Sequence, residues 1–130
     1  MKKIISIVLR LVAAFIMLQT LYFKFTGQPE SVYIFSQMGI EPWGRIGTGV
    51  AELIASILLL IPGTIVLGAL MAIGIMLGAI ATHLLVLGIQ VQGDGGQLFA
   101  YALIVLITSA IVLVLHSDQL ASYKRRFIKA

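Results

Sequence analysis

Four long apolar stretches, separated by short polar segments, dominate the pattern of hydrophobic and polar positions along the chain. They cover residues 4–23, 46–61, 65–89 and 98–115. A helix needs about 20 apolar residues to cross the roughly 30 Å hydrocarbon core of a bilayer. The pattern therefore predicts four transmembrane helices, which we expect to form a single domain over residues 1–130.

The polar segments predict how these helices are connected. Pro62-Gly63-Thr64 is typical of a tight turn, so the second and third spans should form an antiparallel hairpin. Between the first two spans, Pro29 and Glu30 suit a helix start and Gly39 suits a helix end. We expect a short amphipathic helix at the membrane interface, with an irregular loop as the alternative.

The predicted fold class is thus an all-α membrane protein, a four-transmembrane-helix antiparallel bundle with a short interfacial helix between spans one and two. Composition supports a membrane location. Hydrophobic residues make up 60% of the chain and charged residues 11%, whereas soluble domains carry about 25% charged residues. The absence of cysteine excludes disulfides, thiolate nucleophiles, Cys-X-X-Cys redox motifs and iron–sulfur ligation by cysteine.

Basic residues are unevenly distributed between the two predicted sides of the membrane, and basic segments tend to stay in the cytoplasm. With four spans, both termini lie on the same side. That side carries Lys2, Lys3, Lys124, Arg125, Arg126 and Lys129, and the other carries Lys24 and Arg45. We therefore expect a plasma-membrane protein with both termini in the cytoplasm. The basic C-terminal residues should contact anionic lipid of the bilayer rather than nucleic acid.

Ionisable residues inside the spans are informative, because each costs about 2.5–3.5 kcal/mol on membrane-insertion scales. Glu52 follows Ile46 by six residues and His83 precedes Ile89 by six. At about 1.5 Å rise per residue, both lie about 9 Å below the same surface. Because the Pro62 turn makes their helices neighbours, Glu52 and His83 can face each other.

A polar face on the first span reaches the same depth. Its residues are spaced by three and four positions, which places them on one side of a helix: Ser6, Arg10, Ala13, Met17, Thr20 and Lys24. Tyr101 on the fourth span and Gln19 on the first lie near this level. The sequence thus predicts an outer-leaflet ligand-binding pocket formed by Lys24, Glu52, His83, Tyr101 and Gln19.

Structural roles for these groups are the alternative. Glu52 could pair with Lys24 or Arg45 only to join two helices, and His83 could bond a backbone carbonyl in the core. Arg10 is expected to have a structural role, either extending to the lipid headgroups or bonding helix ends or the polar side chains of the fourth span.

Small residues in the spans are typical of close helix packing. Gly74 and Gly78 form a GxxxG motif, and Gly47, Ala51 and Ala55 recur at every fourth position. We expect both sets to lie at helix–helix contacts.

Metal and haem sites are not predicted. His83 and His116 lie near opposite ends of their spans, about 20 Å apart by helix rise, which is too far for one haem iron. A structural zinc ion needs four ligands, and only Glu52 and His83 are suitably placed, which leaves a weak or substrate-completed metal site as the alternative. No catalytic residue is predicted from a motif, and the chain has no evident redox centre of its own.

Several short motifs, in this order along the chain, resemble the DoxX family. They are Arg10, Leu21-Tyr22-Phe23-Lys24-Phe25, Glu41-Pro42, Gly49-Val-Ala-Glu52 and Gly78-Ala-Ile-Ala-Thr-His83. The resemblance implies a four-helix membrane fold in the bacterial inner membrane, with Arg10, Lys24, Glu52 and His83 as its motif residues. DoxX-like proteins include membrane subunits associated with quinone-linked sulfur oxidation and with oxidative-stress redox complexes.

The leading hypothesis is a membrane subunit of a redox complex that binds a quinone-like, lipid-soluble ligand near Glu52 and His83. A carboxylate and an imidazole at equal depth could bond a quinone oxygen and exchange its protons. The sequence leaves two alternatives, a small transporter or channel component, which would need homo-oligomers, and a non-catalytic membrane scaffold. Whether the protein belongs to an enzyme is left open.

Overall fold

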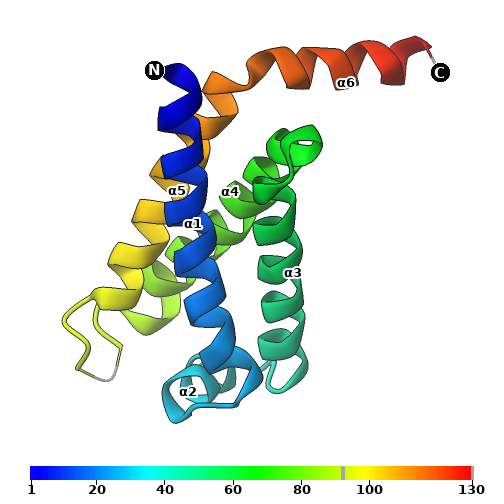
Figure 1. The fold of residues 1–130 in the computed structure, drawn as a ribbon. Helices are drawn as coiled ribbons and strands as arrows, with labels where there is room; N and C mark the ends of the chain where they lie inside the picture. Colours follow the sequence, from blue (N-terminus) through cyan, green and yellow to red (C-terminus); the bar gives the residue numbers. More distant parts are fainter. Residues whose placement is uncertain (92, 130) are drawn as a thin grey trace.

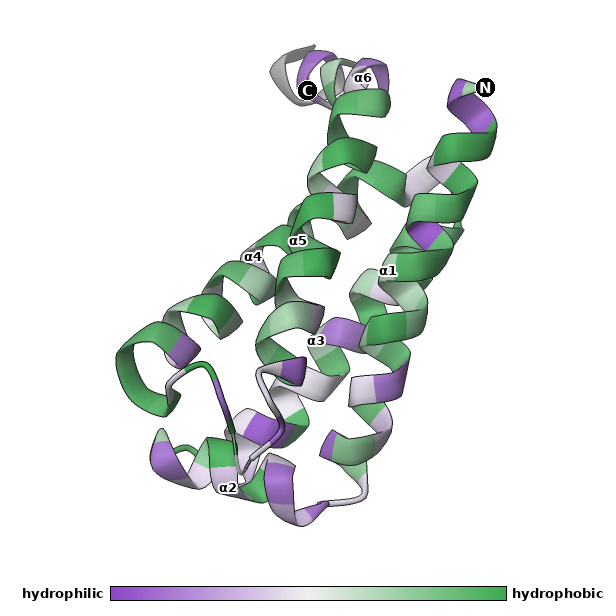
Figure 2. Ribbon diagram, turned by 90° about the vertical axis from the view of Figure 1, so that its left-hand side faces the viewer, coloured by the Kyte–Doolittle hydropathy of each residue, from purple (hydrophilic) through white to green (hydrophobic). Residues whose placement is uncertain are grey.

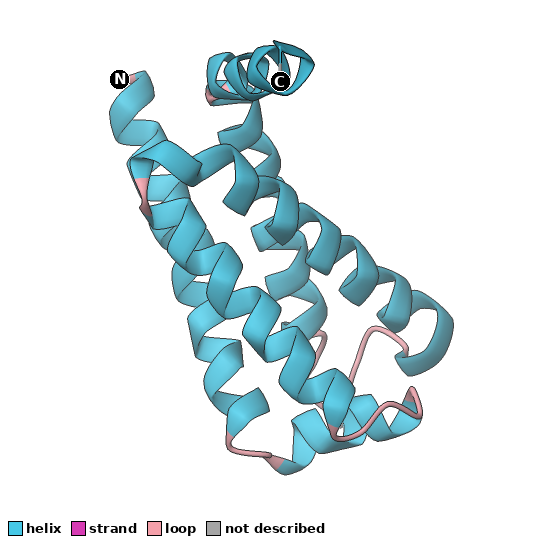
Figure 3. Cartoon of the chain, turned by 90° about the vertical axis from the view of Figure 1, so that its right-hand side faces the viewer, coloured by secondary structure: helices cyan, strands magenta, loops and turns pink. Residues whose placement is uncertain are grey.

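The computed structural model describes residues 1–91 and 93–129, and within this part the chain is helical with no β-strand (Figures 1 and 3). This confirms the predicted fold class. The elements are α1 (Lys2–Phe25), α2 (Pro29–Gln37), α3 (Trp43–Leu60), η1 (Pro62–Thr64), α4 (Ile65–Thr82), η2 (His83–Leu87), α5 (Gln97–Leu115) and α6 (Ser117–Lys129). The side chains of Arg126 and Lys129, part of the charge count above, lie outside the described residues.

Four helical segments are long and apolar enough to cross a membrane. They are Lys2–Phe25, Trp43–Leu60, Pro62–Leu87 and Gln97–Leu115, in agreement with the predicted spans. Figure 2 shows them mostly hydrophobic, with hydrophilic residues gathered at α2 and α6. The third span changes character at His83, where the α-helix gives way to the wider π-helix η2. Apolar periodicity alone does not reveal this change.

The predicted hairpin between the second and third spans is present. α3 and α4 are joined by η1, and they lie close together near this turn because Gly68 has no side chain. A Cβ on Gly68 would lie 2.5 Å from the Leu59 nitrogen and 2.9 Å from the Ala55 oxygen. Farther from the turn the two helices diverge (Figure 1). Gly68 is therefore a true close-packing residue, although it lies outside the motifs that the sequence highlighted.

The glycines of the GxxxG motif do not pack closely against another helix. A Cβ built on Gly74, Gly78 or Gly47 would meet no atom within 4 Å, so the predicted role of these three residues is wrong. Ala55 is fully buried in the core, as expected. Small residues in a span can thus leave space as well as permit contact.

The helix predicted between the first two spans is present as α2. Pro29 occupies its first turn, Glu30 follows, and Gly39 has φ +72° just beyond its end. Ser31 and Phe35, one turn apart, are buried. α2 therefore packs across the end of the bundle opposite the termini (Figure 1).

Helix α6 extends away from the bundle at the end where the N-terminus also lies (Figure 1). The Gln119 side chain joins its beginning to the α3–α4 turn. Its Nε2 donates to the Pro62 carbonyl at 2.9 Å, and its Oε1 accepts from the Val66 N–H at 2.9 Å. One amide thus connects α6 to the hairpin.

We predict that Gly68→Ala lowers the free energy of unfolding in mild detergent by about 1–3 kcal/mol, because the methyl group overlaps backbone atoms that cannot move freely. The control is Gly74→Ala, where the space is open and alanine is favoured over glycine in a helix by about 0.5–1 kcal/mol. Equal effects of the two substitutions would contradict the assignment of Gly68 as the contact point.

Candidate functional site

A cavity of about 870 Å³ lies at the end of the bundle that α2 covers. Residues from all four spans and from α2 line it, and all five predicted pocket residues are among them: Gln19, Lys24, Glu52, His83 and Tyr101. Most of the remaining wall is apolar, with side chains such as Ile16, Phe23, Met76 and Leu98. Such volumes and linings are typical of sites for small organic ligands.

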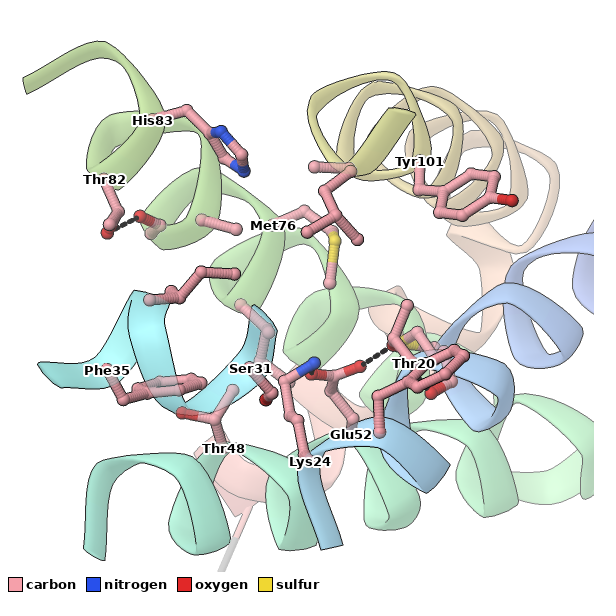
Figure 4. Close-up of a pocket in the computed structure, with 18 of the residues that line it drawn as sticks. Thr20, Lys24, Ser31, Phe35, Thr48, Glu52, Met76, Thr82, His83 and Tyr101 are labelled. Atoms are coloured by element: carbon pink, nitrogen blue, oxygen red, sulfur yellow. Dashed lines mark hydrogen bonds and ion pairs between the residues drawn. The ribbon is translucent and has the colours of Figure 1, made fainter. Parts of the chain in front are cut away.

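Lys24 and Glu52 form an ion pair in the cavity wall. The Lys24 Nζ lies 2.8 Å from Glu52 Oε1, and the side chains are 16% and 2% exposed. The Thr20 hydroxyl donates to the other oxygen, Oε2, at 2.9 Å (Figure 4). Of the two partners considered for Glu52, the structure therefore selects Lys24.

His83 lies on another part of the wall and is 5% exposed. Its Nδ1 bonds the carbonyl of Gly88 at 3.1 Å, as in the backbone-bonded alternative. The ring of Phe99 meets it edge-on at a centroid distance of 5.5 Å. The imidazole is thus held in one orientation while still facing the cavity (Figure 4).

Tyr101 and Gln19 have less specific positions. The Tyr101 hydroxyl accepts a hydrogen bond from Gln97 Nε2 at 2.8 Å and points away from the Lys24–Glu52 pair (Figure 4). Gln19 contributes only to the lining of the cavity. The polar groups that converge on the cavity are therefore chiefly Lys24, Glu52, Thr20 and His83.

Two arginines cap helices α1 and α3 reciprocally. Arg10 of α1 donates from Nη1 to the Leu59 carbonyl near the end of α3, at 3.0 Å. Arg45 of α3 donates to the Lys24 carbonyl near the end of α1, and its Nε lies 2.7 Å from Glu41 Oε1. Arg10 therefore bonds a helix end, one of its predicted roles. The role of Arg45 was not predicted, because its acceptor is a backbone atom of another helix.

Arg10 also belongs to a polar chain at the terminal end of the bundle. Its Nε donates to the Ser6 hydroxyl at 3.2 Å, and that oxygen lies 2.6 Å from His116 Nε2. This chain lies apart from the cavity, whose lining contains none of the three residues. His116 and His83 thus act in separate environments.

Two carboxylates lie near the α2 side of the cavity. Burial and, to a smaller extent, the nearby Asp94 carboxylate raise the pKa of Glu30, which lines the cavity. Burial also opposes ionisation of Asp94, but backbone N–H groups of Val91, Gly96 and Leu98 donate to it and lower its pKa overall. The Asp94 carboxylate therefore stabilises the turn that begins α5.

Sequence reasoning missed the contribution of α2 and of the glycines. Ser31 and Phe35 line the cavity from α2, and their spacing of four residues was the available signal. Gly47, Gly74 and Gly78 line it as well, and all three are exposed. Because residues that line the cavity are also exposed, the cavity opens to the surroundings on the α3 and α4 sides.

We predict strong coupling between Lys24 and Glu52. Glu52→Gln should cost about 3–5 kcal/mol of unfolding free energy, because it leaves the Lys24 charge unpaired in the wall. The double variant Lys24→Met/Glu52→Gln should lose clearly less than the sum of the two single losses in a double-mutant cycle. The control is Lys3→Met on the exposed start of α1, expected within about 0.5 kcal/mol of the wild type. Additive losses in unfolding free energy would show that Lys24 and Glu52 do not stabilise each other.

Comparison with known proteins agrees with the motifs and the fold. A family model described as the DoxX-like family matches residues 8–112, which cover most of each of the four spans and all the cavity residues discussed above. No curated protein and no solved structure matches the chain. The chain belongs to the DoxX-like family and is a multi-pass membrane protein.

Proposed function

We propose that this protein binds a quinone-like, lipid-soluble ligand in the cavity and serves as a membrane subunit of a redox complex. The observation that supports the proposal most is the combination of an apolar wall with a few buried polar groups in one 870 Å³ space. A quinone has the matching form, an apolar ring and tail with oxygen atoms at two positions.

The polar groups of the cavity suit a ligand with oxygen atoms. The Lys24 ammonium has three N–H donors, and the ion pair with Glu52 uses one of its directions. A ligand oxygen can accept from another. Since the pair is already neutralised, the ligand itself need not be charged, which fits a compound dissolved in lipid.

The open side of the cavity suits entry from the membrane. Gly47, Gly74 and Gly78 are exposed and lie on spanning helices. A lipid-soluble molecule could reach the Lys24–Glu52 pair between α3 and α4 without crossing the aqueous phase.

A redox partner is proposed because the chain offers binding groups rather than an electron carrier. It contains no cysteine, so it has no thiol redox chemistry. Electrons exchanged with a bound quinone would come from, or pass to, another protein.

The scaffold alternative also has support in the structure. Lys24, Glu52 and His83 all have partners within the chain, as groups that only hold helices together would. Ligand binding is what separates the two functions, because a scaffold needs no accessible cavity.

We predict that Gly78→Leu strongly weakens ligand binding by filling the cavity, whereas Gly78→Ala retains it. The control Ala110→Leu adds similar bulk at an exposed site of α5 outside the cavity lining. The proteins would be purified in mild detergent, and the extracted small molecules identified by mass spectrometry. We expect a near-stoichiometric quinone in the wild type and both tolerated variants, and about tenfold less or lower in Gly78→Leu, equivalent to about 1.4 kcal/mol of binding. Phospholipid alone in all four samples would refute the proposal and favour the scaffold.

We also propose that both termini face the cytoplasm. The termini and α6 lie at one end of the bundle (Figure 1), and that end carries most basic residues. At the other end Lys24 and Arg45 are both engaged in ion pairs, so they add little free positive charge there. The distribution fits the positive-inside rule.

Cysteine labelling would test this orientation, because the natural chain contains no cysteine. We predict that Ala121→Cys, on the exposed face of α6, is protected from an impermeant maleimide in intact cells. Ser36→Cys, exposed on α2, should be labelled. The reverse pattern would establish the opposite orientation.

A further inference from the structure

The hydrogen bond between His83 and Gly88 determines which ring nitrogen carries the proton. His83 Nδ1 lies 3.1 Å from the Gly88 carbonyl oxygen. A carbonyl oxygen can only accept, so Nδ1 must be the donor. In the neutral imidazole the other nitrogen, Nε2, then presents a lone pair and acts as an acceptor.

The local backbone keeps the ring in this state. The Gly88 N–H donates to the His83 carbonyl at 2.6 Å, closing the π-helical turn η2. Gly88 has φ +80°, a conformation that glycine adopts readily. Residues 83 and 88 are thus joined by a backbone bond and a side-chain bond, and the Phe99 ring supports the imidazole from the side. Reversing the ring would break the bond to Gly88.

The acceptor nitrogen is available to a ligand. His83 lines the cavity, and Figure 4 shows its ring directed inward. Within the described part of the chain, no residue forms a hydrogen bond with its Nε2. Asp94, the nearby carboxylate, is itself held by backbone N–H groups.

The main donor of the polar wall does not discriminate between oxidised and reduced ligands. The Lys24 ammonium can donate to a carbonyl oxygen of a quinone or to a hydroxyl oxygen of a quinol. Only a quinol can also donate a hydrogen bond to His83 Nε2. A quinone carbonyl at that position would place its lone pairs against the lone pair of the ring.

We infer that the cavity is selective for the reduced, hydroxyl-bearing form of its ligand, with His83 as the residue that determines the preference. The inference rests on the proposed function and extends it. Sites that bond a ligand hydroxyl discriminate strongly against analogues that lack it. The preferred ligand is therefore a hydroquinone with an apolar tail, and the protein would hold the quinol in preference to the quinone.

The test compares binding of a decyl-tailed benzoquinone and its quinol to the purified protein. Equilibrium dialysis would be done without oxygen, so that the quinol stays reduced. We expect the quinol to bind about tenfold or more tightly than the quinone. By linkage, a tenfold preference raises the midpoint potential of the bound two-electron couple by about 30 mV.

Two histidine variants make the test specific. His83→Phe keeps an aromatic ring but removes Nε2, and it should bring the affinity ratio close to one. His116→Phe is the same substitution in the polar chain at the other end of the bundle, and it should leave the ratio unchanged. A preference that persists in His83→Phe would overturn the assignment to this residue.

A spectroscopic measurement covers the case in which His83→Phe does not fold. In the His116→Phe background His83 is the single histidine, so nitrogen NMR of labelled protein reports on it alone. Its spectrum should show a protonated Nδ1, and the Nε2 resonance should shift with quinol and not with quinone. Equal affinities in the wild type, or a protonated Nε2, would refute the selectivity while leaving ligand binding intact. Failure of both compounds to bind would refute the proposed function itself.

Discussion

The contact between α1 and α3 carries the polar chemistry on which the rest of the structure depends. Four polar interactions join these helices along their length: Arg10 to the Leu59 carbonyl, Lys24 and Thr20 to Glu52, and Arg45 to the Lys24 carbonyl. Each of these groups would be costly in a bilayer if left alone. Pairing them across one interface removes that cost and determines which faces of α1 and α3 meet. Each arginine also satisfies a carbonyl near a helix end, where intrahelical partners are missing.

The cavity follows from this arrangement together with the geometry of the hairpin. Gly68 draws α3 and α4 together at the η1 turn, and the helices then diverge (Figure 1). In the wider region, glycines at positions 47, 74 and 78 leave space unfilled. Helix α2 covers the end with Ser31 and Phe35. Tight packing at one end of the bundle and open space at the other therefore arise from the same residue type in two different surroundings.

The distinction between a ligand site and a structural polar cluster depends on whether each group has a hydrogen-bonding direction that no other residue uses. Glu52 accepts bonds at both oxygens and is largely committed. Lys24 and His83 each retain a free direction toward the cavity, one as a donor and one as an acceptor. Since the same bonds that stabilise these groups also orient them, a structural role and a binding role are compatible here.

Much of this arrangement could be predicted from the chain alone. The apolar runs determined the number of spans, because crossing a bilayer requires a certain length of apolar helix. The spacing of Ser6, Arg10, Thr20 and Lys24 determined a polar face, because the helical period is independent of context. Equal depth correctly predicted that Glu52 and His83 lie at the same end of the bundle. The small-residue motif at Gly74 and Gly78 wrongly predicted close packing, because the sequence does not show whether another helix faces these residues.

Partner choice was decided by the tertiary structure. Glu52 could have paired with Lys24 or Arg45, and only the angle between α1 and α3 brings Lys24 within 2.8 Å. Residue types do not reveal which backbone carbonyls Arg10 and Arg45 bond, because every residue has a carbonyl. The π-turn at His83 likewise depends on how the chain closes at Gly88. The sequence by itself determined the spans, their order and the depth of the charged groups, because these depend on local composition and helical rise. Which groups touch, and where space remains between them, was decided by helix angles that arise only when the whole bundle packs.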